Sequence, residues 1–290
     1  MSRVSELLRV GPDVNLAEID PAGTPGLPTS KMVRRDPKTW ARTALTELGQ
    51  QLATQQEMLF ANAKVNPRDR RRLLLLLQAM DCGGKDGTVK KVAGAMNPQG
   101  LHIVGFGPPT AVERRHDFLW RIRRALPEPG FVGVFNRSQY EDVLVVRVRK
   151  LAPVRVWRAR YQQINDFEKE LSESGITMVK VMLHISFEEQ RRRLLARLDD
   201  PTKHWKYNPA DVDNRVFWPA YQQAYQDALG RCSTDLAPWY VVPADRKWYR
   251  DWAVANLLLD AFAGLNLRYP PADFDPQAER TRLEEGVSQL

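Results

Sequence analysis

Five short apolar runs alternate along the chain with stretches of helical character. They are LLLLLQ at 73–78, LHIVGF at 101–106, FVGVF at 131–135, MVKVMLHI at 178–185 and WYVVP at 239–243. Unbroken apolar strands separated by helical spacers are typical of a parallel sheet that is covered on both faces, because each strand is then buried on both sides. The sequence therefore predicts an α/β fold with about five strands flanked by helices.

Helical stretches are expected around these strands. Their ranges are 86–95, 110–125, 139–150, 160–174, 187–198, 209–229 and 245–263, and Thr110 with Glu113 has the spacing of a capping box. Before the first strand, leucines at roughly helical intervals predict a leading helix over 37–66. Residues 1–36 are interrupted by prolines and glycines, which favours an extended arm. We therefore divide the chain into an arm at 1–36, the helix at 37–66, a core domain at 67–265 and a tail at 266–290.

Composition narrows the classes of protein that fit. A length of 290 residues with 43% hydrophobic residues is ample for a core, and the formal net charge of +8 favours a polyanionic partner. The two cysteines form no CxxC motif, so neither a zinc site nor a disulfide framework is indicated, and a reducing cytoplasm is expected. No apolar run approaches the length that spans a membrane, and no export signal is recognised.

The loop after the first strand, AMDCGGKDGT at 79–88, has the character of a phosphate-binding loop. It departs from the usual GxxxxGK(S/T) pattern at Ala79 and Asp86. Its glycines let backbone N–H groups approach oxygens closely, the following helix start adds positive potential, and Lys85 adds a full charge. The candidate phosphate-binding residues are Gly83, Gly84, Lys85, Asp86, Gly87 and Thr88. A simple Gly-Gly turn is the alternative.

The two acids of this loop need separate explanations. Asp86 stands at the helix start, where a negative charge is favourable with the helix dipole. Asp81 lies in the loop itself, where a carboxylate repels phosphate unless a cation lies between them or the acid orients an attacking phosphate. Either role for Asp81 implies magnesium.

A second polar segment, FNRSQYED at 135–142, follows the third predicted strand. Because ligands gather at the carboxyl ends of parallel strands, Asn136, Arg137 and Glu141 are expected to face the same crevice as the loop. Arg137 would neutralise charge on a phosphoryl group in transfer, and Glu141 is a candidate magnesium ligand. An ordinary turn with a solvated Arg–Glu pair explains this segment equally well when it is considered alone.

A third segment, at 190–211, is basic and aromatic and includes DPTKHWK. Arg193 and Arg197 are four residues apart and share a helix face, so a lid at about 190–212 could close over phosphates. A charged, solvated helix face is the alternative. Further arginines at 68–72 and 114–124 either extend a positive track or are scattered over the surface.

Together these segments resemble the family-2 polyphosphate kinases. Members carry a GxDxxGK(G/D)GT loop, a (D/N)RSxY motif and a lid with DPxKxWK, which correspond here to AMDCGGKDGT, NRSQYED and DPTKHWK over about 73–265. The resemblance implies a three-layer phosphate-loop kinase fold like that of thymidylate kinase. It also implies magnesium-dependent, reversible transfer of the terminal phosphoryl group of inorganic polyphosphate to a nucleotide, with manganese as a second usable metal.

The resemblance carries roles onto matching residues. Asp81 and Lys85 match the catalytic loop acid and lysine, and Arg137 matches the arginine of the second motif. The lid residues are Arg193, Arg197, Lys203 and Lys206. Asp81 and Glu141 are the expected metal ligands. Ala79 replaces a glycine of the family pattern, which is tolerable if this position is still in the strand.

The substrates and rivals follow from the same comparison. Asn136 followed by Glu141 and Asp142 resembles the subgroup that accepts both nucleoside mono- and diphosphates, so ADP or GDP and also AMP are candidate acceptors. Family members form dimers or tetramers, which implies a homo-oligomer, and neither nucleic acid nor a membrane is an expected partner. An ATP-dependent nucleotide or small-molecule kinase is the first rival. A noncatalytic polyanion-binding protein is the second, but it leaves Asp81 and Glu141 unexplained.

Overall fold

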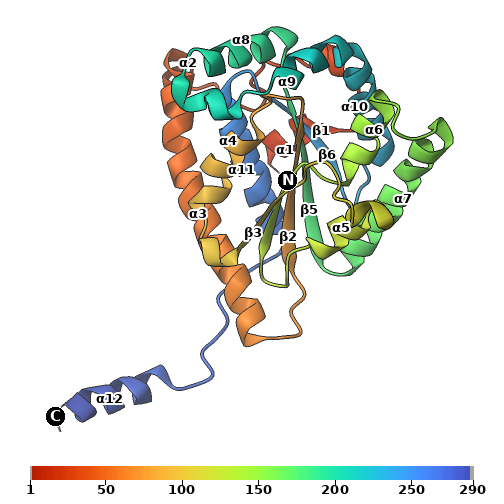
Figure 1. Cartoon of the computed structure of the whole chain (residues 1–290). Coiled ribbons are helices and arrows are strands. Elements are labelled where there is room, and N and C mark those ends of the chain that lie inside the picture. The colour runs from red at the N-terminus through yellow and green to blue at the C-terminus, as the bar shows by residue number, and fades with distance from the viewer. Residues whose placement is uncertain (1, 288–290) are drawn as a thin grey trace.

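A six-stranded sheet lies between two layers of helices in the computed structural model, which describes residues 2–287 (Figure 1). The strands are β1 (Arg9–Val10), β2 (Arg72–Ala79), β3 (Leu101–Gly105), β4 (Val132–Asn136), β5 (Ile176–His184) and β6 (Trp239–Pro243), in the order β1-β6-β5-β2-β4-β3. All neighbours are parallel except β1, which pairs antiparallel with β6. The α/β prediction and its five strands are confirmed, and the two-residue β1 was not predicted.

Burial explains which runs became strands. The five leucines of β2 are buried on both faces because β2 lies in the middle of the sheet, where helices cover both sides. By contrast, β3 is an edge strand, and His102 and Ile103 are exposed on it. Two polar residues interrupt the apolar strands at fully buried positions, Gln78 in β2 and Lys180 in β5. Such positions require internal partners, because a buried polar group without a hydrogen bond is costly.

Two groups of helices cover the sheet (Figure 1). One face carries α3 (Pro37–Val65), α4 (Lys85–Lys91) and α11 (Lys247–Gly264), and the other carries α5 (Trp120–Arg124), α6 (Val145–Val148), α7 (Val154–Glu173) and α10 (Trp218–Cys232). Above the carboxyl ends of the strands lie α8 (Phe187–Leu198) and α9 (Pro209–Asp213). The 3-10 helices are η1 (Leu16–Glu18), η2 (Ala93–Ala95), η3 (Pro98–Gly100), η4 (Glu113–Arg115), η5 (Gln139–Asp142), η6 (Pro201–Lys206) and η7 (Asn214–Phe217). No helix within residues 2–287 is both long and apolar enough to cross a membrane.

Four predicted helices are broken into shorter elements, and the first of them, 86–95, divides into α4 and η2. The range 110–125 holds only η4 and α5, and His116 between them is extended. The capping box does form, with Thr110 N donating to Glu113 Oε2 at 2.6 Å and Glu113 N donating to Thr110 Oγ1 at 3.2 Å. It caps a single turn because no residue of η4 is buried, so no packed face extends the helix. Likewise 139–150 divides into η5 and α6, and 209–229 into α9, η7 and α10.

The prediction of an extended arm at 1–36 is wrong for much of that segment. It forms α1 (Arg3–Leu8), β1 and α2 (Lys31–Arg35), and its apolar side chains Leu8 and Leu16 join the main core. The apolar residues at 4, 8, 16 and 33 are buried. They explain why this segment packs against the core although it is rich in proline and glycine. After α11 the chain leads to α12 (Pro276–Val287), which stands clear of the body (Figure 1). The division into four segments stays a prediction.

Candidate active site

A cavity of 620 Å³ opens at the carboxyl ends of the strands, where β2 lies between β4 and β5. The chain leaves β2 for β3 on one side and later returns to β5 on the other, so the loop after β2 faces a crevice at the point where the strand order reverses. Residues 81–87 form one wall. The remaining predicted residues that line it are Asn136, Arg137, Arg193, Arg197, Lys203 and Lys206. The fold therefore brings the three sequence motifs to one site.

The loop after β2 has the tight geometry that its glycines allow. Gly84 has a φ of 104°, and a Cβ built there would lie 1.9 Å from Arg250 Nη1. Only glycine fits both the left-handed backbone and the close approach of Arg250. Ala79 is the last residue of β2, which confirms that the family glycine is replaced at a strand position.

Lys85 is folded back into the loop that it follows. Its Nζ donates to Ala79 O at 3.0 Å. Burial lowers the pKa of Lys85, the nearby Arg137 lowers it further, and Asp81 and Glu141 oppose this effect. The ammonium is thus held by a backbone carbonyl among charged groups.

Asp81 and Arg137 face each other across the cavity. Arg137 Nη2 lies 3.5 Å from Asp81 Oδ1. Arg137 adopts a φ of 67°, uncommon for a residue with a side chain, and its backbone N donates to Leu77 O at 3.0 Å. Burial works to lower the pKa of Arg137, but Glu141 and Asp81 outweigh it and the net pKa is raised. The guanidinium is therefore firmly charged between two acids.

Glu141 lies behind this pair, where Gln78 of strand β2 holds its carboxylate. The Gln78 amide lies 3.0 Å from Ser138 Oγ, and in the orientation that satisfies both partners its nitrogen donates to Glu141 Oε1 at 3.1 Å. Burial raises the pKa of Glu141, whereas Arg137 and Lys85 oppose the rise. Glu141 is not among the residues that line the cavity, although it was predicted to face the same crevice.

The two acids are compatible with a magnesium ion. Within residues 2–287, no three His, Cys, Asp or Glu side chains form a ready-made metal site. Mg²⁺ is usually held by one or two carboxylates together with waters and substrate phosphates, so a larger protein cluster is not required. Asp81 and Glu141 interact electrostatically with each other and with the same arginine, and hard oxygen donors of this kind suit Mg²⁺.

Asp86 does more than begin a helix. Its Oδ1 accepts from Asn136 Nδ2 at 2.8 Å, and its Oδ2 lies 3.7 Å from Lys206 Nζ. This carboxylate therefore ties the loop to the second motif and to the lid. In the family pattern, glycine or aspartate stands at this position, and here aspartate provides the link.

The basic residues of the segment predicted as a lid contact one another and the acids beside them. Arg197 Nη1 donates to Lys206 O at 2.9 Å and lies 3.5 Å from Asp211 Oδ2. Lys203 Nζ lies 3.2 Å from Asp200 Oδ2. These cations are paired with acids or backbone oxygens of the lid itself, and a polyanion would compete for them.

Two predicted phosphate-binding residues have different roles in the structure. Arg193 is only 7% exposed, and its guanidinium donates to Glu189, to Cys82 O at 2.8 Å and to Ala244 O. It lines the cavity, but its donors are used to hold the loop in place. Thr88 is buried, and its hydroxyl donates to Gly84 O at 3.3 Å and does not reach the cavity wall. The spacing of residues in the sequence could not show that the donors of Thr88 and Arg193 are already bonded to other groups of the protein.

A second cavity of 1130 Å³ lies between α3, α4 and α11 and shares Gly87, Arg192, Lys247 and Arg250 with the first. Its walls carry more basic than acidic side chains. The basic ones are Lys38, Arg42, Lys90, Lys91, Arg192, Arg246, Lys247 and Arg250, and the acidic ones are Asp245 and Asp251. None of the arginines at 68–72 or 114–124 lines either of these two cavities. The basic residues that line the second cavity thus come from α3, α4, α8 and α11 and the turn before α11, and not from the segments 68–72 and 114–124.

The sequence reasoning missed several residues at the site. Arg250 is 2% exposed and lies against the glycines of the loop, and Lys247 lines both cavities. Asp211 lines the cavity, and burial together with Asp81 raises its pKa. The signal for Arg250 was its place, with Asp251, inside the otherwise apolar helix WYRDWAVANLLL.

The fold and site together define a phosphotransferase of the phosphate-loop class, because a glycine-lysine loop, an acid, an arginine and a basic lid meet at one crevice. The model of the family Polyphosphate kinase 2 matches residues 44–269. The chain belongs to this family.

Individual relatives agree with this assignment. The chain is 43% identical to the AMP/ADP-polyphosphate phosphotransferase of Meiothermus ruber, over 90% of this chain and 94% of the relative. It is 40% identical to the ADP-polyphosphate phosphotransferase of Rhodopseudomonas palustris, over 76% of this chain and 78% of the relative. The crystal structure of polyphosphate kinase 2 from Arthrobacter aurescens TC1 has a TM-score of 0.92 and 50% identity, covering 98% of this chain and 97% of that one.

Proposed function

We propose that this protein transfers the terminal phosphoryl group of inorganic polyphosphate to a nucleotide, with ADP, GDP and AMP as acceptors. The observation that carries the proposal is a basic cavity directly beside the crevice around Asp81, with which it shares the lining residues Gly87, Arg192, Lys247 and Arg250. A chain of many phosphates needs a positive path beyond the reacting group, whereas an ATP donor does not. The relatives named for AMP and ADP as substrates support the choice of acceptors.

The mechanism we propose depends on positioning and charge neutralisation, because phosphoryl transfer leaves little covalent work for a protein. Lys85 and Arg137 would stabilise the oxygens of the transferring phosphoryl group. Asp81, held 3.5 Å from Arg137, would align the acceptor phosphate. Lys203, Lys206 and Arg197 would leave their internal partners and close the lid over the phosphates.

Magnesium is part of this proposal, with Asp81 and Glu141 as its protein ligands. When bound, it would neutralise charge on the phosphate oxygens of donor and acceptor. An assembly of identical subunits and a cytoplasmic location are also proposed, the latter from the sparse use of cysteine. The residue roles rest on the arrangement of charges in the crevice and on the family motifs.

Mixing the protein with magnesium, long-chain polyphosphate and either ADP or AMP, without ATP, tests the function directly. New ATP from ADP is the expected product, and ADP should appear in the reaction with AMP. A nucleotide kinase that uses ATP would give no ADP from AMP, and any ATP it formed from two ADP molecules would appear equally without polyphosphate. Polyphosphate binding without any turnover would instead favour a noncatalytic polyanion-binding protein.

Asp81→Asn tests the role of the loop acid. The change keeps the size of the side chain but removes the charge that faces Arg137, so we expect kcat to fall by at least about 100-fold, within the range of a positioned catalytic group. The melting temperature should stay close to that of the parent, because Asp81 lines the cavity and is not in the core. Near-normal turnover by this variant would contradict the role.

A further inference from the structure

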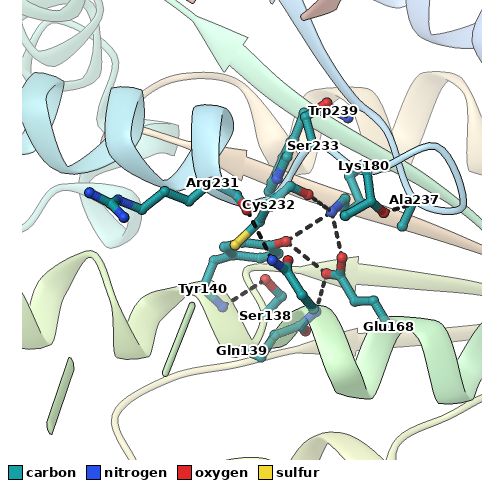
Figure 2. Close-up of polar contacts among 12 residues, drawn as sticks. Ser138, Gln139, Tyr140, Glu168, Lys180, Arg231, Cys232, Ser233, Ala237 and Trp239 are labelled. Atoms are coloured by element: carbon teal, nitrogen blue, oxygen red, sulfur yellow. Dashed lines mark hydrogen bonds and ion pairs between the residues drawn. The ribbon is translucent and has the colours of Figure 1, made fainter. Parts of the chain in front are cut away.

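A lysine is completely buried in the middle of β5. Lys180 has 0% side-chain exposure and its partner Glu168, from α7, has 1%. Lys180 Nζ lies 2.5 Å from Glu168 Oε2, 2.9 Å from Tyr140 OH and 2.6 Å from Cys232 O (Figure 2). Three acceptors therefore match the three protons of the ammonium.

The second oxygen of the acid is directed at the second motif. Glu168 Oε1 accepts from Tyr140 OH at 2.8 Å and from Gln139 Nε2 at 3.0 Å (Figure 2). Tyr140 is further fixed by its ring, which packs edge to face against Trp239 with centroids 4.7 Å apart. One carboxylate thus joins a strand, a helix and the 3-10 turn η5.

Stability alone does not account for this arrangement. Taking two charges out of water is costly, and apolar residues of similar volume often serve equally well or better in a core. Buried ionic groups are best explained where they select one geometry over others. In this core the geometry that they select is that of η5, because two consecutive residues of η5 bind the acid.

Those two residues stand between Arg137 and Glu141 in the chain. Ser138 Oγ accepts from Tyr140 N at 3.2 Å, and Ser138 O accepts from Glu141 N at 3.2 Å, so the turn moves as a unit. The left-handed backbone of Arg137 needs support from its surroundings, and the anchored turn directly after it supplies that support. A shift of Tyr140 would therefore displace both the Arg137 guanidinium that faces Asp81 and the Glu141 carboxylate behind it.

We propose that Lys180 and Glu168 are positioning residues, which hold Gln139 and Tyr140 so that Arg137 and Glu141 stay aligned with Asp81. Neither of the two lines the cavity, and the contacts that lead from them toward it run through η5. The acceptor oxygen of Glu168 is the essential element, and Lys180 neutralises it and fixes its direction. This inference rests on the proposed function for its kinetic readout.

Two double variants isolate that oxygen. Lys180→Met with Glu168→Gln removes both charges but keeps a carbonyl oxygen that can accept from Gln139 and Tyr140. Lys180→Met with Glu168→Leu removes the charges and the acceptor as well. Both variants lose the Lys180 contacts to Cys232 O and Tyr140, so this loss cancels in the comparison. Arg71→Met with Asp69→Leu is the control for loss of a charged pair. This ion pair lies just before the amino end of β2, and the crevice lies at the carboxyl end.

We expect the Met/Gln variant to retain most of the kcat of the parent, and the Met/Leu variant to lose at least tenfold. The KM for ADP should change less than twofold in both, because the walls of the cavity are unaltered. Tyr140→Phe deletes a single hydroxyl, keeps the packing against Trp239, and should lower kcat about threefold to tenfold. This third variant keeps the test decisive if the Met/Leu variant does not fold.

Hydrogen exchange of the segment 136–143 provides a readout that does not depend on the reaction. Faster exchange is expected in Met/Leu and Tyr140→Phe, but not in Met/Gln or in the control. If the parent shows no turnover with polyphosphate, the proposed function fails, whereas the exchange pattern still tests the anchor. A parent-like kcat in Tyr140→Phe or in Met/Leu, or equal losses of kcat in the two double variants, would overturn the inference.

Discussion

At the scale of single residues, the pKa values of two residues at the site are shifted in opposite directions. Burial raises the pKa of Glu141 above its ordinary value of 4.5, and burial together with Arg137 lowers that of Lys85 from 10.5. On acidification Glu141 therefore takes up a proton at a higher pH than a free glutamate does. On the alkaline side Lys85 loses its proton at a lower pH than a free lysine does. The pH range in which both Glu141 and Lys85 are charged is therefore narrowed from both ends.

The pH profile of kcat/KM for ADP tests this assignment, because that ratio reports the pKa values of the free enzyme. We expect activity to fall through an acid limb above pH 4.5 and an alkaline limb below pH 10.5. In Glu141→Gln the residual activity should lose the acid limb and keep the alkaline one. An acid limb at the same position in this variant would assign it to another acid, and Asp211, which lines the cavity and also has a raised pKa, is one alternative.

The site residues that could be predicted from the sequence are those in the loops that directly follow the strands. Asp81, Lys85, Asn136 and Arg137 do meet at one cavity, because parallel strands place their carboxyl ends together. Their roles in catalysis stay predictions. The sequence could not show that Thr88 and Arg193 are occupied by the protein itself, since hydrogen-bond partners distant in the chain decide this. Lys180 is a single charged residue within the apolar run MVKVMLHI, and this position could have indicated a buried charge. The run was interpreted only as a strand.

At the scale of elements, the start of α4 is held against α11 at a distance that only glycine permits. Gly84→Ala should destabilise the fold by about 2 kcal/mol, because the left-handed backbone disfavours a side chain and the new Cβ would meet Arg250 at 1.9 Å. We also expect turnover to be lost, because the loop must shift. Urea unfolding followed by fluorescence measures the change in the free energy of unfolding.

Gly94→Ala is the matched control for this prediction, since it changes a glycine just after α4. The nearest atom to its Cβ would be Val89 O at 3.8 Å, an ordinary contact. This variant should have nearly parent stability and full turnover. Equal unfolding midpoints for the two variants would show that the approach of Arg250 does not constrain the loop.

Helix boundaries were predictable only where a packed face accompanies the periodicity. Helix α8 agrees with its predicted range because it has both a Ser186 cap and buried residues on one side. The range 110–125 contained a genuine capping box, but its basic residues bury no continuous face, so the helix does not propagate. Local signals start a helix, and tertiary packing determines how far it runs.

At the scale of the whole molecule, we expect the segment before α3 to contribute strongly to stability and the last helix to contribute little. The first segment adds β1 to the edge of β6 and buries Leu8 and Leu16 in the core. It also fixes the start of α11, where Tyr249 OH donates to Pro25 O at 2.6 Å and Arg246 Nε donates to Ala22 O at 2.8 Å. The same part of α11 carries Lys247 and Arg250 into both cavities. The N-terminal segment therefore supports the site from outside it.

Deleting residues 1–36 and, separately, residues 276–290 tests this difference. Full burial of one aliphatic side chain stabilises a protein by about 1.5–3 kcal/mol, so losing the four buried side chains at 4, 8, 16 and 33 is comparable with the total stability of about 5–15 kcal/mol of a domain. The N-terminal deletion should thus unfold the whole molecule or lower its melting temperature steeply, with loss of turnover. The C-terminal deletion removes a helix that stands clear of the body, and thermal unfolding of the rest should be unchanged (Figure 1). If calorimetry of the N-terminal deletion gives the parent melting temperature, the segment is an appendage and not part of the core.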